Sequence, residues 1–218
     1  MEESTENAAF SPFQLFEEDF NLGLDPKGLE ITDVPDSEDT QFDFINLDSN
    51  DLTRAKKSNF WDFLINNLSV HIRYGEKLSI DKLISYYPSY EEPLFFMKNN
   101  LHFSVERCYS WILKYAKIDG NETKNPAKKV KKIQSVCMDK GEQIVDEVYL
   151  TLVKLLRKNP EEHTCLKIWE LLGFMASFRL PSMKFLYPMY NYLLTVIEHN
   201  PSEDSKTWAK YVLKRMYR

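Results

Sequence analysis

The stretch "WELLGFMASFRLPS" (residues 169–182) constrains the fold most, because it is apolar through nearly all of its first ten residues. A helix that is apolar almost all round lies either inside a larger helical body or across a membrane. A bilayer requires about 20 predominantly apolar residues, so this stretch is too short to cross one. The sequence therefore predicts a central buried helix, which ends where Pro181 drives the preceding residue out of helical geometry.

Helical spacing of apolar residues recurs from residue 51 to the C-terminus, and the first such segment is "DLTRAKKSNFWDFLINNL". Gly is scarce, at 6 of 218 residues, which disfavours folds built on strands, tight turns and phosphate-binding loops. Capping residues, Gly and Pro separate the segments and predict about eight short helices. The expected fold is all-α, a compact superhelical or antiparallel bundle over residues 51–218.

Local signals predict where several helices begin. Ser79 and Ser202 are expected to cap helices, and Pro126 is expected in the first turn of another. Thr164 is expected to cap the apolar helix described above. Pro188 is expected either to kink the following helix or to mark its start.

Charge divides the chain into two parts. Residues 1–50 hold 14 of the 33 acids and one of the 28 bases, a net charge of −13, which leaves +8 on residues 51–218. The first part alternates acids with aromatic and aliphatic residues and predicts a disordered acidic tail. This tail is a solubilising segment, an autoinhibitory segment that folds back on the basic domain, or a docking peptide. The aromatic residues that would dock are Phe10, Phe13, Phe16 and Phe20.

Lysines supply the candidate binding site. "NPAKKVKKIQ" sets four of them around two turns of one helix, and a second group follows Arg54. A charge run is usually a solvated helix face, but the excess of +8 predicts an extended positive surface that attracts a polyanion. The candidate polyanion-binding residues are Lys124, Lys128, Lys129, Lys131, Lys132, Lys56 and Lys57.

The sequence holds no pattern that predicts catalysis, a metal or a cofactor. Asp146 and Glu147 are adjacent, so on a helix they diverge by about 100° and cannot work as an acid–base pair. We expect them near the start of a helix, complementing its dipole and pairing with Lys or Arg. The four His share no ligand spacing, and phosphate-binding Gly motifs are absent from the sequence. A non-enzymatic protein is expected.

The cysteines and the N-terminus predict the compartment. Cys108, Cys137 and Cys165 are odd in number and lack CxxC spacing, so we expect buried free thiols in a reducing environment. The N-terminus lacks the basic and apolar regions of a secretory signal, and no segment is long and apolar enough to span a bilayer. We expect a cytoplasmic protein.

Residues 51–218 resemble a divergent myosin tail homology 4 (MyTH4) domain. "VDEVYLTLVKLLRKNP" is similar to the family's R-D-E-I-Y-x-Q-L-x-K-Q-x-x-x-N-P segment, and "KIWELLGFMASFRLPS" is similar to its G-W-x-L-L-x-L-x-x-x-x-F-x-P-S segment. Thr151 and Leu155 stand where the family usually has Gln. The motif residues, to which we assign structural roles, are Asp146, Glu147, Tyr149, Asn159, Pro160, Trp169, Pro181 and Ser182.

The resemblance implies a cytoskeleton-associated interaction module that binds microtubules, whose surface is acidic, or links a motor or cargo protein to them. Neither a motor nor a FERM sequence flanks the domain, so a stand-alone module is expected. Nucleic acid is not expected as the polyanion, because no aromatic residue is interleaved with the lysines to stack bases. The alternative is a helical adaptor or structural subunit that binds a protein or peptide partner in an apolar groove, and not tubulin.

Overall fold

The computed structural model describes residues 48–69, 79–118 and 125–217. Within these ranges the chain forms nine α-helices and one short 3-10 helix, with a single isolated bridge in place of a sheet. The prediction of an all-α fold is confirmed. Some of the predicted binding residues lie outside the described ranges, and these are Lys124, Phe10, Phe13, Phe16 and Phe20.

Two helices replace the one expected at the N-terminus of the domain. They are α2 (Ser49–Lys57) and α3 (Phe60–Asn67). Between them, the side chain of Asn59 accepts hydrogen bonds from the backbone amides of Trp61 and Asp62. A capping side chain of this kind offers the backbone an alternative to continuing the preceding helix, so the segment is divided.

The next region contains little helix. α5 (Ile80–Leu83) is a single turn, and a 3-10 turn (Asn99–Leu101) precedes the first long helix. Residues 86–98 between them, hereafter the covering segment, pair with Leu68 through one antiparallel bridge at Phe95.

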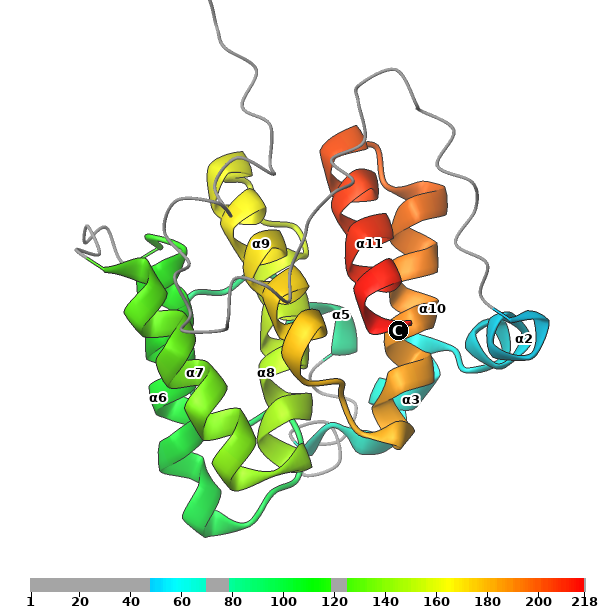
Figure 1. The fold of residues 1–218 in the computed structure, drawn as a ribbon. Coiled ribbons are helices and arrows are strands. Elements are labelled where there is room, and N and C mark those ends of the chain that lie inside the picture. The colour runs from blue at the N-terminus through cyan, green and yellow to red at the C-terminus, as the bar shows by residue number, and fades with distance from the viewer. Residues whose placement is uncertain (1–47, 70–78, 119–124, 218) are drawn as a thin grey trace, which may run out of the picture. The chain divides into compact units, whose positions relative to one another are not determined.

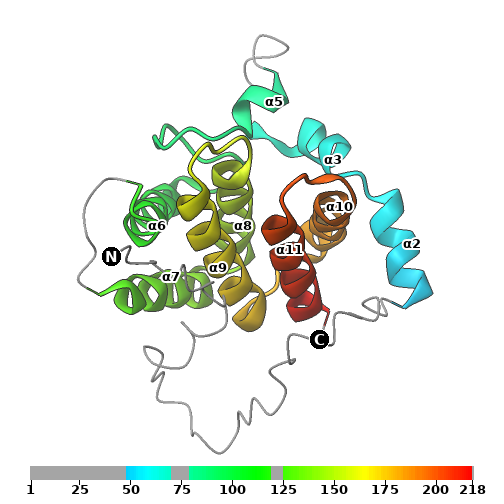
Figure 2. The ribbon, with the colours of Figure 1, turned by 90° about the horizontal axis from the view of Figure 1, so that it is seen from above.

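Six long helices form the body of the described domain. α6 and α7 pack together at one side, α10 and α11 pack together at the other, and α8 and α9 lie between them (Figure 1). Seen from above, α2 and α3 lie against α10 at its outer side (Figure 2). The bounds are α6 (His102–Tyr115), α7 (Pro126–Lys140), α8 (Glu142–Leu156), α9 (Glu162–Phe178), α10 (Met183–His199) and α11 (Glu203–Met216).

The apolar helix predicted from the sequence is α9, and it is buried in the body as expected. Trp169 is only 2% exposed, and α9 packs against α8 and, most extensively, against α11. Gly173 permits the closest approach, since a Cβ atom there would lie 2.8 Å from Cε1 of Tyr211 and 3.7 Å from the ring of Trp208. The lack of a side chain at this position lets two aromatic residues of α11 lie directly on the α9 backbone.

The predicted caps are confirmed at Ser79, whose hydroxyl accepts the backbone N–H of Lys82, and at Ser202, whose hydroxyl accepts that of Ser205. Pro126 stands in the first turn of α7, as predicted. Each of these residues acts on backbone groups within the first turn of its own helix, so its role can be predicted from the neighbouring sequence.

One predicted helix start is wrong, and one of the two alternatives given for Pro188 is excluded. α9 begins at Glu162, two residues before Thr164, whose side chain is buried. The side chain of Asn159 accepts the backbone N–H of Glu161 and turns the chain into the helix earlier than expected. α10 begins at Met183 and continues through Pro188, so this proline does not mark its start.

Candidate functional site

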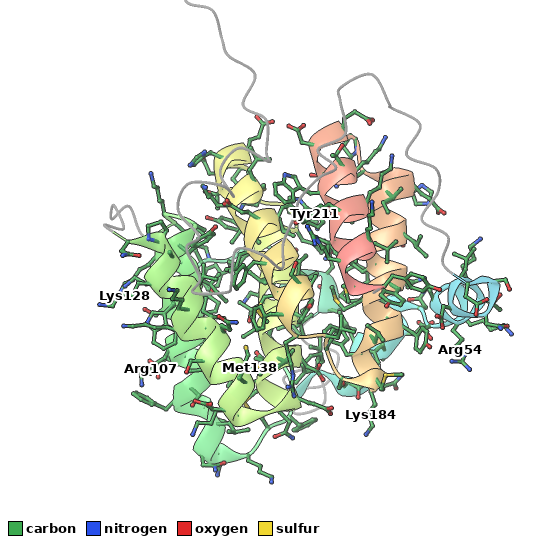
Figure 3. All side chains as sticks on the ribbon, viewed as in Figure 1. Arg54, Arg107, Lys128, Met138, Lys184 and Tyr211 are labelled. Carbon is green, nitrogen blue, oxygen red and sulfur yellow. The ribbon has the colours of Figure 1, made fainter. Side chains whose placement is uncertain are left out.

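The predicted lysines form two separate groups in the structure. One group lies on α7 and the other on α2, at opposite sides of the domain. Lys128 of α7 and Arg54 of α2 mark these two sides (Figure 3), and the view from above agrees (Figure 2). A single extended positive surface that includes both groups is therefore excluded, and each must be considered as a separate site.

The α7 group is presented outward by the burial of the opposite side of the helix. Val130, Ile133 and Cys137 face the core, while Lys128 and Lys131 are exposed. Lys129 and Lys132 are half-buried. None of the four forms an ion pair with another described residue. Their charges are therefore available to an external anion.

α6 adds an arginine and two aromatic rings to this group. The guanidinium carbon of Arg107 lies 5.0 Å from the ring centroid of Trp111 and 5.5 Å from that of Phe103, which is 66% exposed. From α7, the ammonium of Lys132 lies 5.4 Å from the Trp111 centroid. These distances are those of cation–π interactions, which hold the charged groups in place without neutralising their charge.

We call this surface the α6–α7 face (Figure 3). It corrects the expectation that no aromatic residue stands among the lysines, because the rings come from the neighbouring helix. The sequence carried one signal for it, since Phe103, Arg107 and Trp111 recur at intervals of four. The face consists of Phe103, Arg107, Trp111, Lys128, Lys129, Lys131 and Lys132.

The α2 group is arranged differently. Arg54 donates to the hydroxyl of Tyr187 at 3.0 Å, and that hydroxyl donates to Asp51 at 2.9 Å, which fixes α2 against α10. Lys56 and Lys57 are exposed in the last turn of α2, where cations are favourable at the negative end of the helix dipole. A structural role thus accounts for much of this group.

The adjacent motif acids of α8 face in different directions and hold different segments. Asp146 accepts the backbone N–H of Ser182 at 2.7 Å and its hydroxyl at 2.6 Å, which ties α8 to the corner between α9 and α10. Glu147 is 1% exposed and accepts the backbone N–H groups of Leu94 at 2.6 Å and of Phe95 at 2.9 Å.

These contacts differ from the role expected for the two acids. The first turn of α8 carries Glu142, whereas Asp146 and Glu147 lie one turn further on and form no ion pair with a described Lys or Arg. The expectation of a helix-dipole role was wrong, because distant backbone amides provide stronger partners for buried carboxylates than the helix end does.

Burial controls the ionisation of Glu147. Loss of solvation raises its pKa to about 7, although the two backbone amides act in the opposite direction. The carboxyl group therefore titrates near neutral pH, far above its ordinary value of 4.5.

We expect stability to fall as the pH rises through this range. A folded-state pKa raised above the unfolded value gives a contribution that is complete below about pH 4.5 and is lost as the pH passes 7. The loss is roughly 3 kcal/mol, at about 1.4 kcal/mol per pKa unit. Urea unfolding of the wild type and of Glu147→Gln from pH 4.5 to 8 measures it, since only the wild type should show this decline. Parallel pH profiles would contradict the assignment.

The other motif residues also shape the corners of the fold. The hydroxyl of Tyr149 donates to the carbonyl of Arg179 at 3.0 Å, and Asn159 orients the turn before α9. Pro181 is buried in the next corner, whereas Pro160 is exposed. None of these residues lies on the α6–α7 face.

The described cysteines are free thiols, as predicted. Cys108 and Cys137 are buried and Cys165 is half-buried. Burial raises the pKa of Cys137 to about 12, so this thiol is protonated and unreactive at neutral pH. In the part of the chain that the structure describes, no His, Cys, Asp and Glu cluster could hold a metal, and no helix is long and apolar enough to cross a bilayer.

Comparisons with known proteins agree with this architecture. Residues 130–218 match the family model of the MyTH4 domain. Among solved structures, the MyTH4-FERM MF1 domain of Dictyostelium discoideum myosin VII superposes with a TM-score of 0.62 at 21% identity, covering 79% of this chain and 34% of that chain. The MF2 domain of the same myosin gives 0.61 at 15% identity, covering 72% and 35%. No curated protein matches the chain.

The resemblance to the MyTH4 family read from the sequence is confirmed for residues 130–218, which match the model of that domain. This is a family of non-catalytic, cytoskeleton-associated interaction domains found in myosin tails. The chain spans about a third of the length of the solved chains that it matches. At these identities the likeness to the solved structures establishes the fold alone.

Proposed function

We propose that this domain is a non-enzymatic module of the cytoplasm that binds the acidic surface of microtubules through the α6–α7 face, and so links a motor or a cargo protein to them. One observation carries the proposal: the four α7 lysines and Arg107 form one outward-facing cationic surface with no internal ion pair among the described residues. An acidic partner would supply the missing counter-charges.

The chemistry of the face supports an electrostatic mode of binding. Exposed lysines act as mobile point charges, whereas Arg107 is held over aromatic rings and offers a directed guanidinium. Clustered positive charges accelerate the encounter with a polyanion, and the attraction between the two weakens as salt screens it. The lysines of α2 lie at the opposite side of the domain and cannot join the same contact.

Co-sedimentation of the full chain with stabilised microtubules tests the proposal. We expect binding at low ionic strength and a dissociation constant that rises roughly tenfold or more between about 25 and 200 mM salt, since the screening length shortens over this range. Binding that is absent at low salt would refute the microtubule proposal. Binding that is insensitive to salt would refute the electrostatic mode.

Single-stranded nucleic acid is the competing polyanion, because the exposed ring of Phe103 could stack on a base beside the cationic groups. A fluorescent oligonucleotide measured at the same salt concentrations separates the two. We expect it to bind more weakly than tubulin. If it binds more tightly and displaces the domain from microtubules, the face is a nucleic-acid surface instead.

The alternative function, a helical adaptor for a protein partner, is favoured by a different feature. A pocket on the covering-segment side of α8 holds polar groups without partners among the described residues. A binder of this kind should depend less on salt than the α6–α7 face, since aromatic rings form part of the pocket wall and fewer cations line it.

A further inference from the structure

A pocket of about 190 Å³ lies between α5, the covering segment, α6 and α8. Its aromatic walls are Tyr87, Tyr90 and Tyr109, and the rings of the last two lie 5.5 Å apart. The hydroxyl of Tyr109 donates to the carbonyl of Tyr87 at 3.0 Å, which fixes α6 against the covering segment. A cavity of about 150 Å³ already admits benzene, so this one has room for a single large side chain.

The covering segment is anchored to α8 and to the residue that follows this helix, so the pocket is preformed. Near its end, Leu94 and Phe95 donate backbone hydrogen bonds to Glu147. At its start, the backbone N–H of Tyr86 donates to the carbonyl of Arg157 at 2.7 Å. A preformed cavity does not have to be ordered by its ligand, which favours binding of small groups.

α8 presents a polar stripe to this pocket. Glu147, Thr151 and Lys154 recur at i, i+4 and i+7, and all three line the cavity. From Val148 to Leu155 the other residues of the helix have apolar or aromatic side chains and are buried, including Val148 and Leu152 on either side of the stripe. Buried polar groups are normally hydrogen-bonded, so we expect the side chains of this stripe to have hydrogen-bonding partners in the cavity that they face.

Two members of the stripe lack such partners within the described residues. The hydroxyl of Thr151, a residue only 4% exposed, forms no hydrogen bond there. The half-buried ammonium of Lys154 forms neither a hydrogen bond nor an ion pair, and its nearest aromatic contact is the ring of Tyr87 at 6.0 Å. Burial without a hydrogen-bonding counter-ion is costly for an ammonium group. Glu147 differs, because its two oxygens already accept amide hydrogens.

We propose that this pocket binds the C-terminal carboxylate of a partner peptide whose last residue has an aromatic or large aliphatic side chain. Lys154 and Thr151 donate to the carboxylate, and the three tyrosines surround the side chain. In a chain terminus these two groups are attached to one Cα atom, which suits a pocket of this size.

The charges at the rim restrict the ligand to a single negative charge. Glu91, Glu92 and Glu147 line the pocket together with Lys82, and of these Glu91 and Lys82 are exposed whereas Glu147 is buried. These carboxylates repel a polyanion, whereas one carboxylate aligned on Lys154 is attracted at short range. The pocket is therefore distinct in chemistry from the α6–α7 face, and its ligand is a peptide rather than a microtubule.

NMR titration of the full chain, labelled with ¹⁵N on Lys and Thr, tests this proposal with the peptide acetyl-Gly-Gly-Phe. We expect the amide signals of Thr151 and Lys154 to shift with a dissociation constant on the order of millimolar. The same peptide with a C-terminal amide should bind at least roughly tenfold more weakly, because it lacks the charge. Equal binding of the acid and the amide, or unshifted signals at about 10 mM peptide, would overturn it.

Variants separate the pocket from nonspecific effects. Lys154→Met keeps the length of the side chain and should weaken binding of the acid roughly tenfold or more, while Thr151→Val should weaken it severalfold. Lys184→Met removes an exposed lysine of α10, away from the pocket. It should change the dissociation constant of the acid peptide by less than about twofold. If Lys154→Met and Lys184→Met behave alike, the proposal fails. Co-sedimentation of Lys154→Met with microtubules should remain at the wild-type level, so the two proposals can fail independently.

Discussion

Glu147→Ala is expected to lower the free energy of unfolding by roughly 3 kcal/mol at pH 7. Truncation leaves the buried N–H of Leu94 and the half-buried N–H of Phe95 without their acceptor. Each unsatisfied amide costs about 1–3 kcal/mol, and water that enters through the pocket relieves part of the loss. Urea unfolding followed by far-UV circular dichroism gives the change in free energy.

Glu142→Ala is the matched control, because it removes an exposed acid from the first turn of the same helix. Its loss is limited to the interaction with the helix dipole, about 0.3–1 kcal/mol. If Glu147→Ala is no more destabilising than this control, the carboxylate does not hold the covering segment on α8.

Gly173→Leu is expected to destabilise the domain by about 1–3 kcal/mol, and its mechanism is overpacking. The new Cβ atom would lie 2.8 Å from the ring of Tyr211, and the rest of the side chain would have to displace Trp208. Leu has a higher helix propensity than Gly, and this difference offsets up to about 1 kcal/mol of the loss. The shift in the urea midpoint at constant slope measures the net effect.

A double-mutant cycle identifies the contact. In a Tyr211→Ala background, Gly173→Leu should cost less, because the space of the ring becomes available. The same cost in both backgrounds would show that the α9–α11 contact at this glycine is not what limits the size of the side chain.

The features recognised from sequence were those that depend on near neighbours in the chain. α9 was predictable, because an apolar stretch too short for a membrane has to be buried. The caps at Ser79 and Ser202 satisfy amides only three residues away. The family was recognisable from spaced motif residues such as Trp169 and Pro181, which keep their places in helices and corners.

The predicted helix boundaries differ from the structure where two local signals compete. The side chains of Asn59 and Asn159 redirect the backbone, whereas helical periodicity favours one continuous helix across Asn59 and Thr164 offers a later cap for α9. Asn is as good a cap as Ser or Thr, so sequence alone gave no order of preference.

The candidate sites depend on contacts between distant segments, which periodicity cannot supply. The basic group of α7 was visible in the sequence, but its pairing with Trp111 of α6 and its separation from Lys56 and Lys57 required the fold. Thr151 and Lys154 were likewise visible as polar residues of one helix, whereas the aromatic cover over them comes from residues 86–98.

The α6–α7 face is tested most directly by comparing two double charge reversals in microtubule co-sedimentation at one low salt concentration. Lys128→Glu with Lys131→Glu alters this face, and Lys56→Glu with Lys57→Glu alters the far side. All four lysines are exposed and both pairs change the net charge equally, so long-range effects are matched. We predict that the α7 pair raises the dissociation constant roughly tenfold or more and the α2 pair by less than about twofold. Equal losses, or a loss confined to the α2 pair, would contradict the assignment of microtubule binding to the α6–α7 face.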